Sequence, residues 1–163
     1  MSTIDKNKAI IEYLLTCNNI KNSALYFNLI DAKDGNIQII TTSTDTTYDK
    51  SFIDGSKPKK YTCNIVTFKS INDLALVVGT SYANENVDDV ADVQTLIDWI
   101  DEQNEARNFP DFGTNCIINS IKTTTDEPRF DGINTSLQPA LAMYSIGIMV
   151  DYIDTSKVIW KDE

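Results

Sequence analysis

Residues 84–109 read NENVDDVADVQTLIDWIDEQNEARNF. The apolar residues recur at spacings of three and four, a pattern that predicts an amphipathic α-helix with one buried stripe. Asn84 or Asn86 can cap its first turn, and Pro110 disfavours helical geometry in the residue before it. We therefore expect a helix over about residues 85–107, packed against a core through Val90, Val93, Leu96, Ile97 and Ile100.

The other faces of this predicted helix are acidic. Eight carboxylates are set against one cation, Arg107. A solvated outer face is the usual role of such a surface, and a functional role stays open beside it. The carboxylates are Glu85 and seven residues that form a candidate acidic surface: Asp88, Asp89, Asp92, Asp98, Asp101, Glu102 and Glu105.

Length and composition predict one domain over residues 1–163, because a chain of 163 residues with 42% hydrophobic content can bury one compact core. The formal net charge of −10 and the pI near 4.4 argue against a protein that binds nucleic acid through phosphate contacts. The charge is uneven along the chain. Residues 1–83 carry 9 Lys and 8 acids, a net +1, and residues 84–163 carry 5 Lys or Arg and 16 acids, a net −11.

Cysteine usage and hydropathy indicate the cellular compartment in which the protein is expected. Cys17, Cys63 and Cys116 are odd in number and far apart, which favours buried free thiols in a reducing environment. No apolar stretch approaches the roughly 20 residues that span a bilayer. We expect a protein that is made and kept in the cytosol, or in something assembled there.

The remaining patterns predict an α+β fold: a mixed, mainly antiparallel sheet of about four to six strands packed against two helices. Strict alternation marks residues 141–153 as a long strand with one buried face, central to the sheet. The other expected elements are a helix over about 4–17, strands at 24–30 and 37–42 joined as a hairpin, an interior strand at 61–70, a short strand or buried turn within 71–82, and a strand at 115–123.

Two stretches lack a pattern and predict long loops. The first, about residues 43–60, contains Tyr48, Phe52 and Ile53 among turn-forming and polar residues. The second, about residues 124–139, contains Phe130. Long irregular connections in compact domains tend to be functional arms or mobile solvated loops, and the embedded aromatics favour a functional arm here.

The search for catalytic chemistry is negative. The chain has no histidine, which removes the commonest general base and the Ser-His and Cys-His pairs. The six glycines are too scattered for a nucleotide-binding loop, and residues 31–36 lack the alternating acids of a calcium loop. A pair of carboxylates acting as in glycosidases stays open. We expect no catalytic, cofactor-binding or metal-binding residues.

A family resemblance supplies the functional expectation. Four segments carry it: YFNLIDA (residues 26–32), FIDGSKPKKYTCNIV (52–66), ENVDDVADVQTLIDWIDEQNEARNFPDF (85–112) and LQPALAMYSIGIMVDYIDTSKVIW (137–160). In order and character, the chain resembles the tail terminator proteins of long-tailed bacteriophages, which are also called minor capsid or tail completion proteins. The resemblance covers most of the chain and includes no catalytic signature.

The resemblance implies a structural virion protein that forms a ring, usually a hexamer, on the last ring of the tail tube. Such a ring stops tube polymerisation and joins the tail to the head-completion complex. The implied partners are copies of the chain itself, the tail tube protein, the connector at the head and, in contractile tails, the sheath. DNA passes through without specific binding, and no membrane is involved. The protein would lie at the head-proximal end of the tail, after assembly in the cytoplasm of a host bacterium.

Two sets of residues follow as hypotheses within this resemblance. The acidic surface of the predicted helix would face the DNA channel or an axial contact. The subunit or partner interface would include Tyr48, Phe52, Ile53, Lys59, Lys60, Phe130 and Trp160.

Two alternatives remain. Another head-tail joining protein, or the cap of a phage-tail-like bacteriocin, shares most of these features, and a tail tube gene directly downstream would favour a terminator. A carboxylate-dependent hydrolase is the enzymatic alternative, and it requires two carboxylates that converge in a cleft.

Overall fold

The computed structural model describes residues 3–18, 20, 25–27, 37–47, 50–71, 85–136 and 140–158. The predicted α+β class, with a mainly antiparallel sheet and two helices, is confirmed. The described elements are α1 (Thr3–Leu14), β1 (Leu25–Phe27), β2 (Ile37–Thr47), β3 (Lys57–Ile71), α2 (Glu85–Glu105), β4 (Cys116–Thr123), β5 (Arg129–Asn134) and β6 (Ala140–Asp154).

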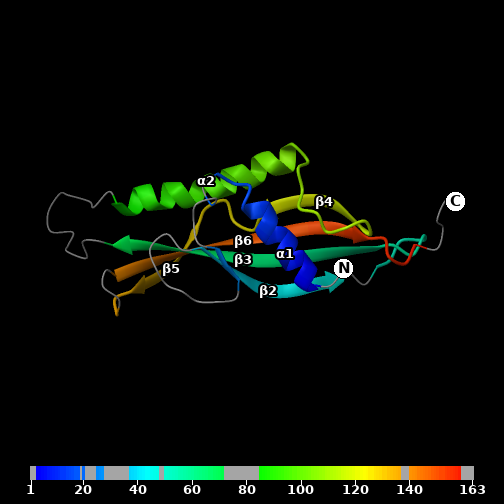
Figure 1. Ribbon diagram of the computed structural model, residues 1–163, viewed down its shortest axis with the longest axis horizontal. Helices are drawn as coiled ribbons and strands as arrows, with labels where there is room; N and C mark the ends of the chain where they lie inside the picture. The colour runs from blue at the N-terminus through cyan, green and yellow to red at the C-terminus, as the bar shows by residue number, and fades with distance from the viewer. Residues whose placement is uncertain are drawn as a thin grey trace.

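The centre of the sheet is the antiparallel pair of β3 and β6. Their register runs without a bulge over 15 residue pairs, from Lys57 opposite Asp154 to Ile71 opposite Ala140. β2 pairs with the other edge of β3, and β4 and β5 share the other edge of β6 (Figure 1). The prediction that the alternating strand is central is therefore confirmed.

The core lies on one face of this pair, because side chains alternate between the faces of a strand. Five residues of β6 point into it and are at most 4% exposed: Tyr144, Ile146, Ile148, Val150 and Tyr152. Tyr61, Cys63 and Ile65 of β3 complete this layer. Cys17 and Cys63 are buried free thiols, as expected, and burial raises the pKa of the Cys63 thiol to about 12. Cys116 is only half-buried.

Both helices cover this same face, since residues of both belong to the core cluster. α2 packs chiefly against β4, and α1 packs against β2 (Figure 1). The predicted stripe of α2 is confirmed: Val93, Leu96, Ile97 and Ile100 are buried, and Val90 is half-buried against the core. α1 was expected to continue to residue 17, but the helix ends at Leu14 and Leu15 is 40% exposed.

Polar residues of α1 bind to core tyrosines. Lys6 is only 3% exposed, and its Nζ donates to the hydroxyl of Tyr152 at 2.5 Å. The hydroxyl of Tyr61 donates to Oδ1 of Asn7 at 2.7 Å. The ring of Phe112 meets both tyrosine rings edge-on, at centroid distances of 5.7 and 5.5 Å. These contacts fix α1 on β3 and β6 and satisfy the polar groups that it buries.

α2 ends at a local backbone hydrogen-bond motif, which lies before the end that Pro110 predicts. The amide of Asn108 donates to the carbonyl of Gln103 at 2.9 Å, and the amide of Arg107 donates to the carbonyl of Asn104 at 3.2 Å. These are the two bonds of a Schellman motif, and Arg107 occupies its left-handed position with φ 56°. The helix therefore stops at Glu105 because its last carbonyls are satisfied there.

Both predicted long loops are wrong in extent. β2 continues to Thr47 and β3 begins at Lys57, so strands occupy half of residues 43–60. Threonine is β-branched and favours strands, and among the described residues β1 covers β2 only as far as Ile39, so no described strand pairs with the other edge of residues 40–47. Within residues 124–139, β5 uses the length of β6 that β4 leaves unpaired. Its bulge beside Phe130 and its mostly exposed residues give little periodic signal.

The predicted hairpin of residues 24–30 and 37–42 is also wrong. β1 pairs with β2 in parallel, with Leu25 opposite Ile37 and Phe27 opposite Ile39. A tight turn joins antiparallel strands only, so the Asp-Gly-Asn sequence at 34–36 misled the prediction. The expected strand or turn within residues 71–82 lies outside the described residues beyond Ile71, where β3 ends.

The left-handed position at the end of α2 gives a stability prediction. We expect Arg107→Gly to be more stable than Arg107→Ala by about 1 kcal/mol, because both remove the charge but only glycine avoids the Cβ clash at positive φ. Urea unfolding of the two variants measures the difference. Equal stability of the two, or a more stable alanine variant, would contradict the motif.

Candidate functional site

The connection between β2 and β3 presents apolar side chains to solvent. We call its described residues, 50–56, the tip. Ile53 is fully exposed (100%) and Phe52 is 52% exposed. Two adjacent exposed apolar side chains make the tip a candidate contact surface.

The tip is an ordered turn. The amide of Phe52 donates to the carbonyl of Ser56 at 2.9 Å, and the amide of Gly55 donates to the carbonyl of Phe52 at 3.0 Å. The Asp54 carboxylate accepts from the amide and the hydroxyl of Ser56, at 2.9 and 2.7 Å, which lowers its pKa. Gly55 supplies the left-handed conformation that the turn requires (φ 87°). These bonds fix the backbone of the turn that carries Phe52 and Ile53.

An ion pair fixes the base of the tip to β6. Nζ of Lys59 lies 2.7 Å from Oδ2 of Asp154, and both side chains are 20% exposed. Partial desolvation acts to raise the pKa of the Asp154 carboxyl, but hydrogen bonds from Lys59 and Ser156 and the charge of Lys59 outweigh it. The pKa of Asp154 therefore lies well below its ordinary value. The pair joins the first residues of β3 to the end of β6.

The predicted interface residues do not form one site. Phe52 and Ile53 share the tip, and Lys59 lies at its base on the helix side of the sheet, while the side chain of Lys60 projects from the opposite face. Phe130 is 54% exposed and packs against Tyr144 at a ring distance of 5.7 Å. Tyr144 precedes Asp154 by ten residues of β6, about 33 Å along a strand, so Phe130 is far from the tip. Tyr48 and Trp160 lie outside the described residues.

The candidate acidic surface is described in part. Asp98, Asp101, Glu102 and Glu105 are exposed on α2. Asp98 accepts a hydrogen bond from the side chain of Gln94 at 3.2 Å. Asp88, Asp89 and Asp92 belong to the same helix, but their side chains lie outside the description. The described acids follow the outer side of α2, away from its buried stripe.

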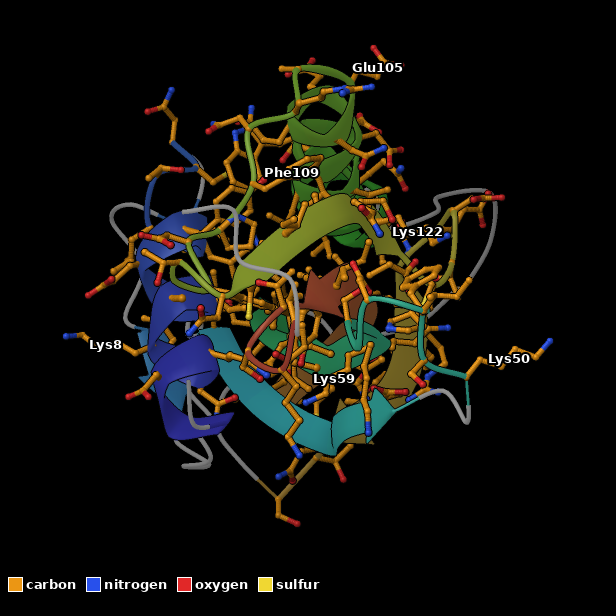
Figure 2. The ribbon with its side chains drawn as sticks, turned by 90° about the vertical axis from the view of Figure 1, so that its right-hand side faces the viewer. Lys8, Lys50, Lys59, Glu105, Phe109 and Lys122 are labelled. Atoms are coloured by element: carbon orange, nitrogen blue, oxygen red, sulfur yellow. The ribbon has the colours of Figure 1, made fainter. Side chains whose placement is uncertain are left out.

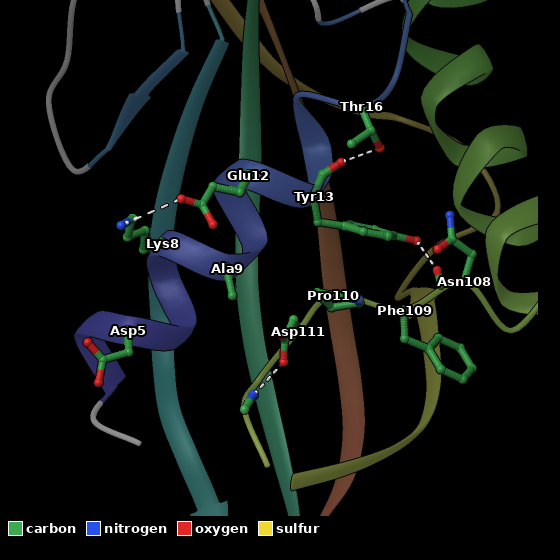
Figure 3. Close-up of a pocket in the computed structure, with 11 residues that line it drawn as sticks. Asp5, Lys8, Ala9, Glu12, Tyr13, Thr16, Asn108, Phe109, Pro110 and Asp111 are labelled. Carbon is green, nitrogen blue, oxygen red and sulfur yellow. Dashed lines mark hydrogen bonds and ion pairs between the residues drawn. The ribbon is translucent and has the colours of Figure 1, made fainter. Parts of the chain in front are cut away.

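Sequence reasoning missed an open cleft between α1 and residues 108–113, which we call the α1 cleft (Figure 3). Its volume is about 630 Å³. Ala9, Tyr13 and Pro110 form its buried apolar floor, with Phe109 half-buried beside them. The hydroxyl of Tyr13 donates to the carbonyl of Asn108 at 2.9 Å, which ties the two walls together. Burial, and to a lesser extent Cys17, holds the pKa of Tyr13 well above its ordinary value, so this donor stays neutral.

The rim of the α1 cleft is acidic. Asp5, Glu12 and Asp111 line it together with one cation, Lys8, which forms an exposed pair with Glu12 at 3.6 Å. The carboxylate of Asp111 accepts from the amide of Gly113 at 2.7 Å. The sequence signal for this site was the aromatic turn NFPDFG at 108–113, but nothing in the sequence placed that turn beside residues 5–16.

Comparison with known proteins leaves the family open. No family model matches the chain, and no curated protein matches its sequence. Among the described residues, no group of three or more acidic or cysteine side chains is arranged to hold a metal ion. None of the described helices is both long and apolar enough to cross a membrane.

The Lys59–Asp154 pair predicts a pH dependence of stability. The folded-state pKa of Asp154 is depressed, so its stabilisation is present above the unfolded value of about 4 and is lost as the pH falls through the folded value. We expect Asp154→Asn to lower the free energy of unfolding by about 1 kcal/mol at pH 7, and by progressively less below pH 4. Urea unfolding at pH 7 and pH 3 measures this.

The matched control is Asp151→Asn. Asp151 pairs with Lys122 at 3.6 Å, and the Lys122 side chain is 50% exposed, so the expected loss is smaller. An Asp154→Asn loss of the same size at pH 3 and pH 7 would contradict the assignment.

Proposed function

We propose that this chain is a structural protein of the tail terminator kind, which forms a closed ring on the end of a phage tail tube. In that role it ends tube polymerisation and offers a surface to the head-completion complex. Its ring, six copies by the resemblance, sits at the head-proximal end of the tail. The protein acts through contacts with its own copies, the tube protein and the connector, and is not an enzyme.

The observation that carries the proposal is the tip. A fully exposed isoleucine beside a half-exposed phenylalanine, on a turn fixed by its own hydrogen bonds, is typical of a surface that becomes buried on assembly. The ion pair at its base keeps this turn in register with β6, the central strand.

Charge supports the same role. A net charge of −10 disfavours phosphate binding, which suits a ring through which DNA slides. The exposed acids of α2 would line the channel or an axial contact surface. A hydrolase would need two carboxylates that converge in a cleft, whereas the described acids of α2 lie along one solvated helix face. At the α1 cleft, Glu12 is paired with Lys8 and Asp111 accepts the amide of Gly113, so these two carboxylates are held at the rim by other partners. A joining protein or bacteriocin cap of similar build remains the alternative within this class.

The proposal is tested with the tube protein that it expects to be encoded beside this gene. Purified tube protein is polymerised with and without this chain, and tube lengths are measured by negative-stain electron microscopy. We expect added protein to halt growth and to form a ring at one end of each tube. Tubes that keep growing at both ends with no bound ring would contradict the proposal, and so would the absence of a tube gene nearby.

The acidic surface gives a second prediction. We expect Asp101→Lys/Glu102→Lys to leave the melting curve nearly unchanged, because exposed substitutions usually shift stability by less than about 0.5 kcal/mol each. Phage with this double variant should yield fewer assembled particles or eject their DNA poorly, because the channel or axial surface gains positive charge.

The control is Asp126→Lys/Glu127→Lys, which makes the same charge change on exposed residues before β5. Normal infection by phage with the α2 variant, equal to that of the control, would mean that these acids are only a solvated face.

A further inference from the structure

We propose that the tip of one copy docks in the α1 cleft of the next copy, and that this contact closes the ring. The inference rests on the proposed function and adds its acceptor site. The acceptor site is the α1 cleft, which the sequence did not reveal, and its occupant is the tip of a second copy of this chain.

The two surfaces match in apolar character. The tip offers Ile53 and Phe52 at the end of a fixed turn. The α1 cleft offers a floor of Ala9, Tyr13 and Pro110, and its volume of about 630 Å³ has room for several side chains. Insertion would remove the exposed isoleucine from water without rearranging either surface, because each is already held by its own hydrogen bonds.

The two surfaces also match in charge. The tip itself carries Lys50 and Asp54, and Lys57 follows it at the start of β3, whereas Lys59 is paired with Asp154. The rim of the α1 cleft carries three acids, Asp5, Glu12 and Asp111, against the single Lys8. With Lys57, the end of the molecule that carries the tip is slightly cationic, and it is attracted to the acidic rim in the encounter.

The positions of the two surfaces decide what their contact builds. Figure 2 places Lys50, which begins the tip, and Lys8, on the rim of the cleft, on opposite sides of the molecule. A tip therefore cannot occupy the cleft of its own chain. Contact between two different surfaces on opposite sides is head-to-tail, and such contacts repeat until they close a ring or extend as a filament.

Cross-linking between engineered cysteines tests the contact. Ile53→Cys and Glu12→Cys are both exposed positions, so each variant should fold, which the melting curve checks. In a Cys116→Ser background, the double variant is treated with a short bis-maleimide, both as concentrated protein and bound to tail tubes. We expect a ladder of covalent oligomers that stops at the size of the ring, and no cross-linked species from either single variant. Dimers from Ile53→Cys alone would show a tip-to-tip contact and overturn the inference.

Mixing two defective variants tests the head-to-tail direction. Ile53→Asp removes the apolar tip and Thr16→Trp fills the cleft, so each should lower self-association on the order of 10-fold or more. An equal mixture should form heterodimers by sedimentation velocity, because one working tip and one working cleft remain. Normal rings from Thr16→Trp alone, or no heterodimers in the mixture, would overturn the inference.

The wild-type protein run in parallel separates the two proposals. Rings on tube ends without cross-links in the double variant would overturn the docking of tip into cleft and leave the terminator role intact. Wild-type protein that neither binds tubes nor self-associates, with no cross-links, would overturn both.

Discussion

The unbroken pairing of β3 with β6 is the constraint on which the rest of the structure depends. Fifteen consecutive residue pairs fix which side chains share a face. A shift of one residue would turn the five core-facing residues of β6, from Tyr144 to Tyr152 at every second position, away from the core. The same length sets the positions of β4 and β5, which divide the free edge of β6 between them. At one end, the pairing begins with Lys57 opposite Asp154, and the tip projects directly beyond it.

The helices depend on this pairing for their positions. α1 bonds through Lys6 and Asn7 to tyrosines of β6 and β3, and its Tyr13 then bonds to the segment that follows α2. The α1 cleft lies between these two walls, 95 residues apart at the Tyr13–Asn108 bond. The cleft is thus formed by the packing of α1 over the sheet, and no local segment contains it. The tip, in contrast, belongs to one hairpin and keeps its shape through its own bonds.

Sequence patterns predicted the parts of the fold where burial imposes a clear period. The stripe of α2 and the alternation of β6 both gave correct elements, because one face of each is packed more tightly than the other. Polar segments failed for the converse reason: residues 43–47 are all Ser, Thr or Asp, and β5 is an edge strand with little buried periodicity. The parallel pairing of β1 was missed because a turn-like sequence at 34–36 outweighed any long-range signal. Of the candidate site, Phe52 and Ile53 were predicted, and the α1 cleft was not, since it depends on tertiary packing.

The central claim is that this chain closes a ring at the end of a tube by contacts between unlike surfaces of neighbouring copies. The most direct measurement is a cryo-electron microscopy reconstruction of tail tubes incubated with the wild-type protein. The account predicts a single closed ring on one end, with the turn at Ile53 of each copy against residues 108–113 of its neighbour. Tube ends without a ring, or copies joined through two identical surfaces, would contradict it.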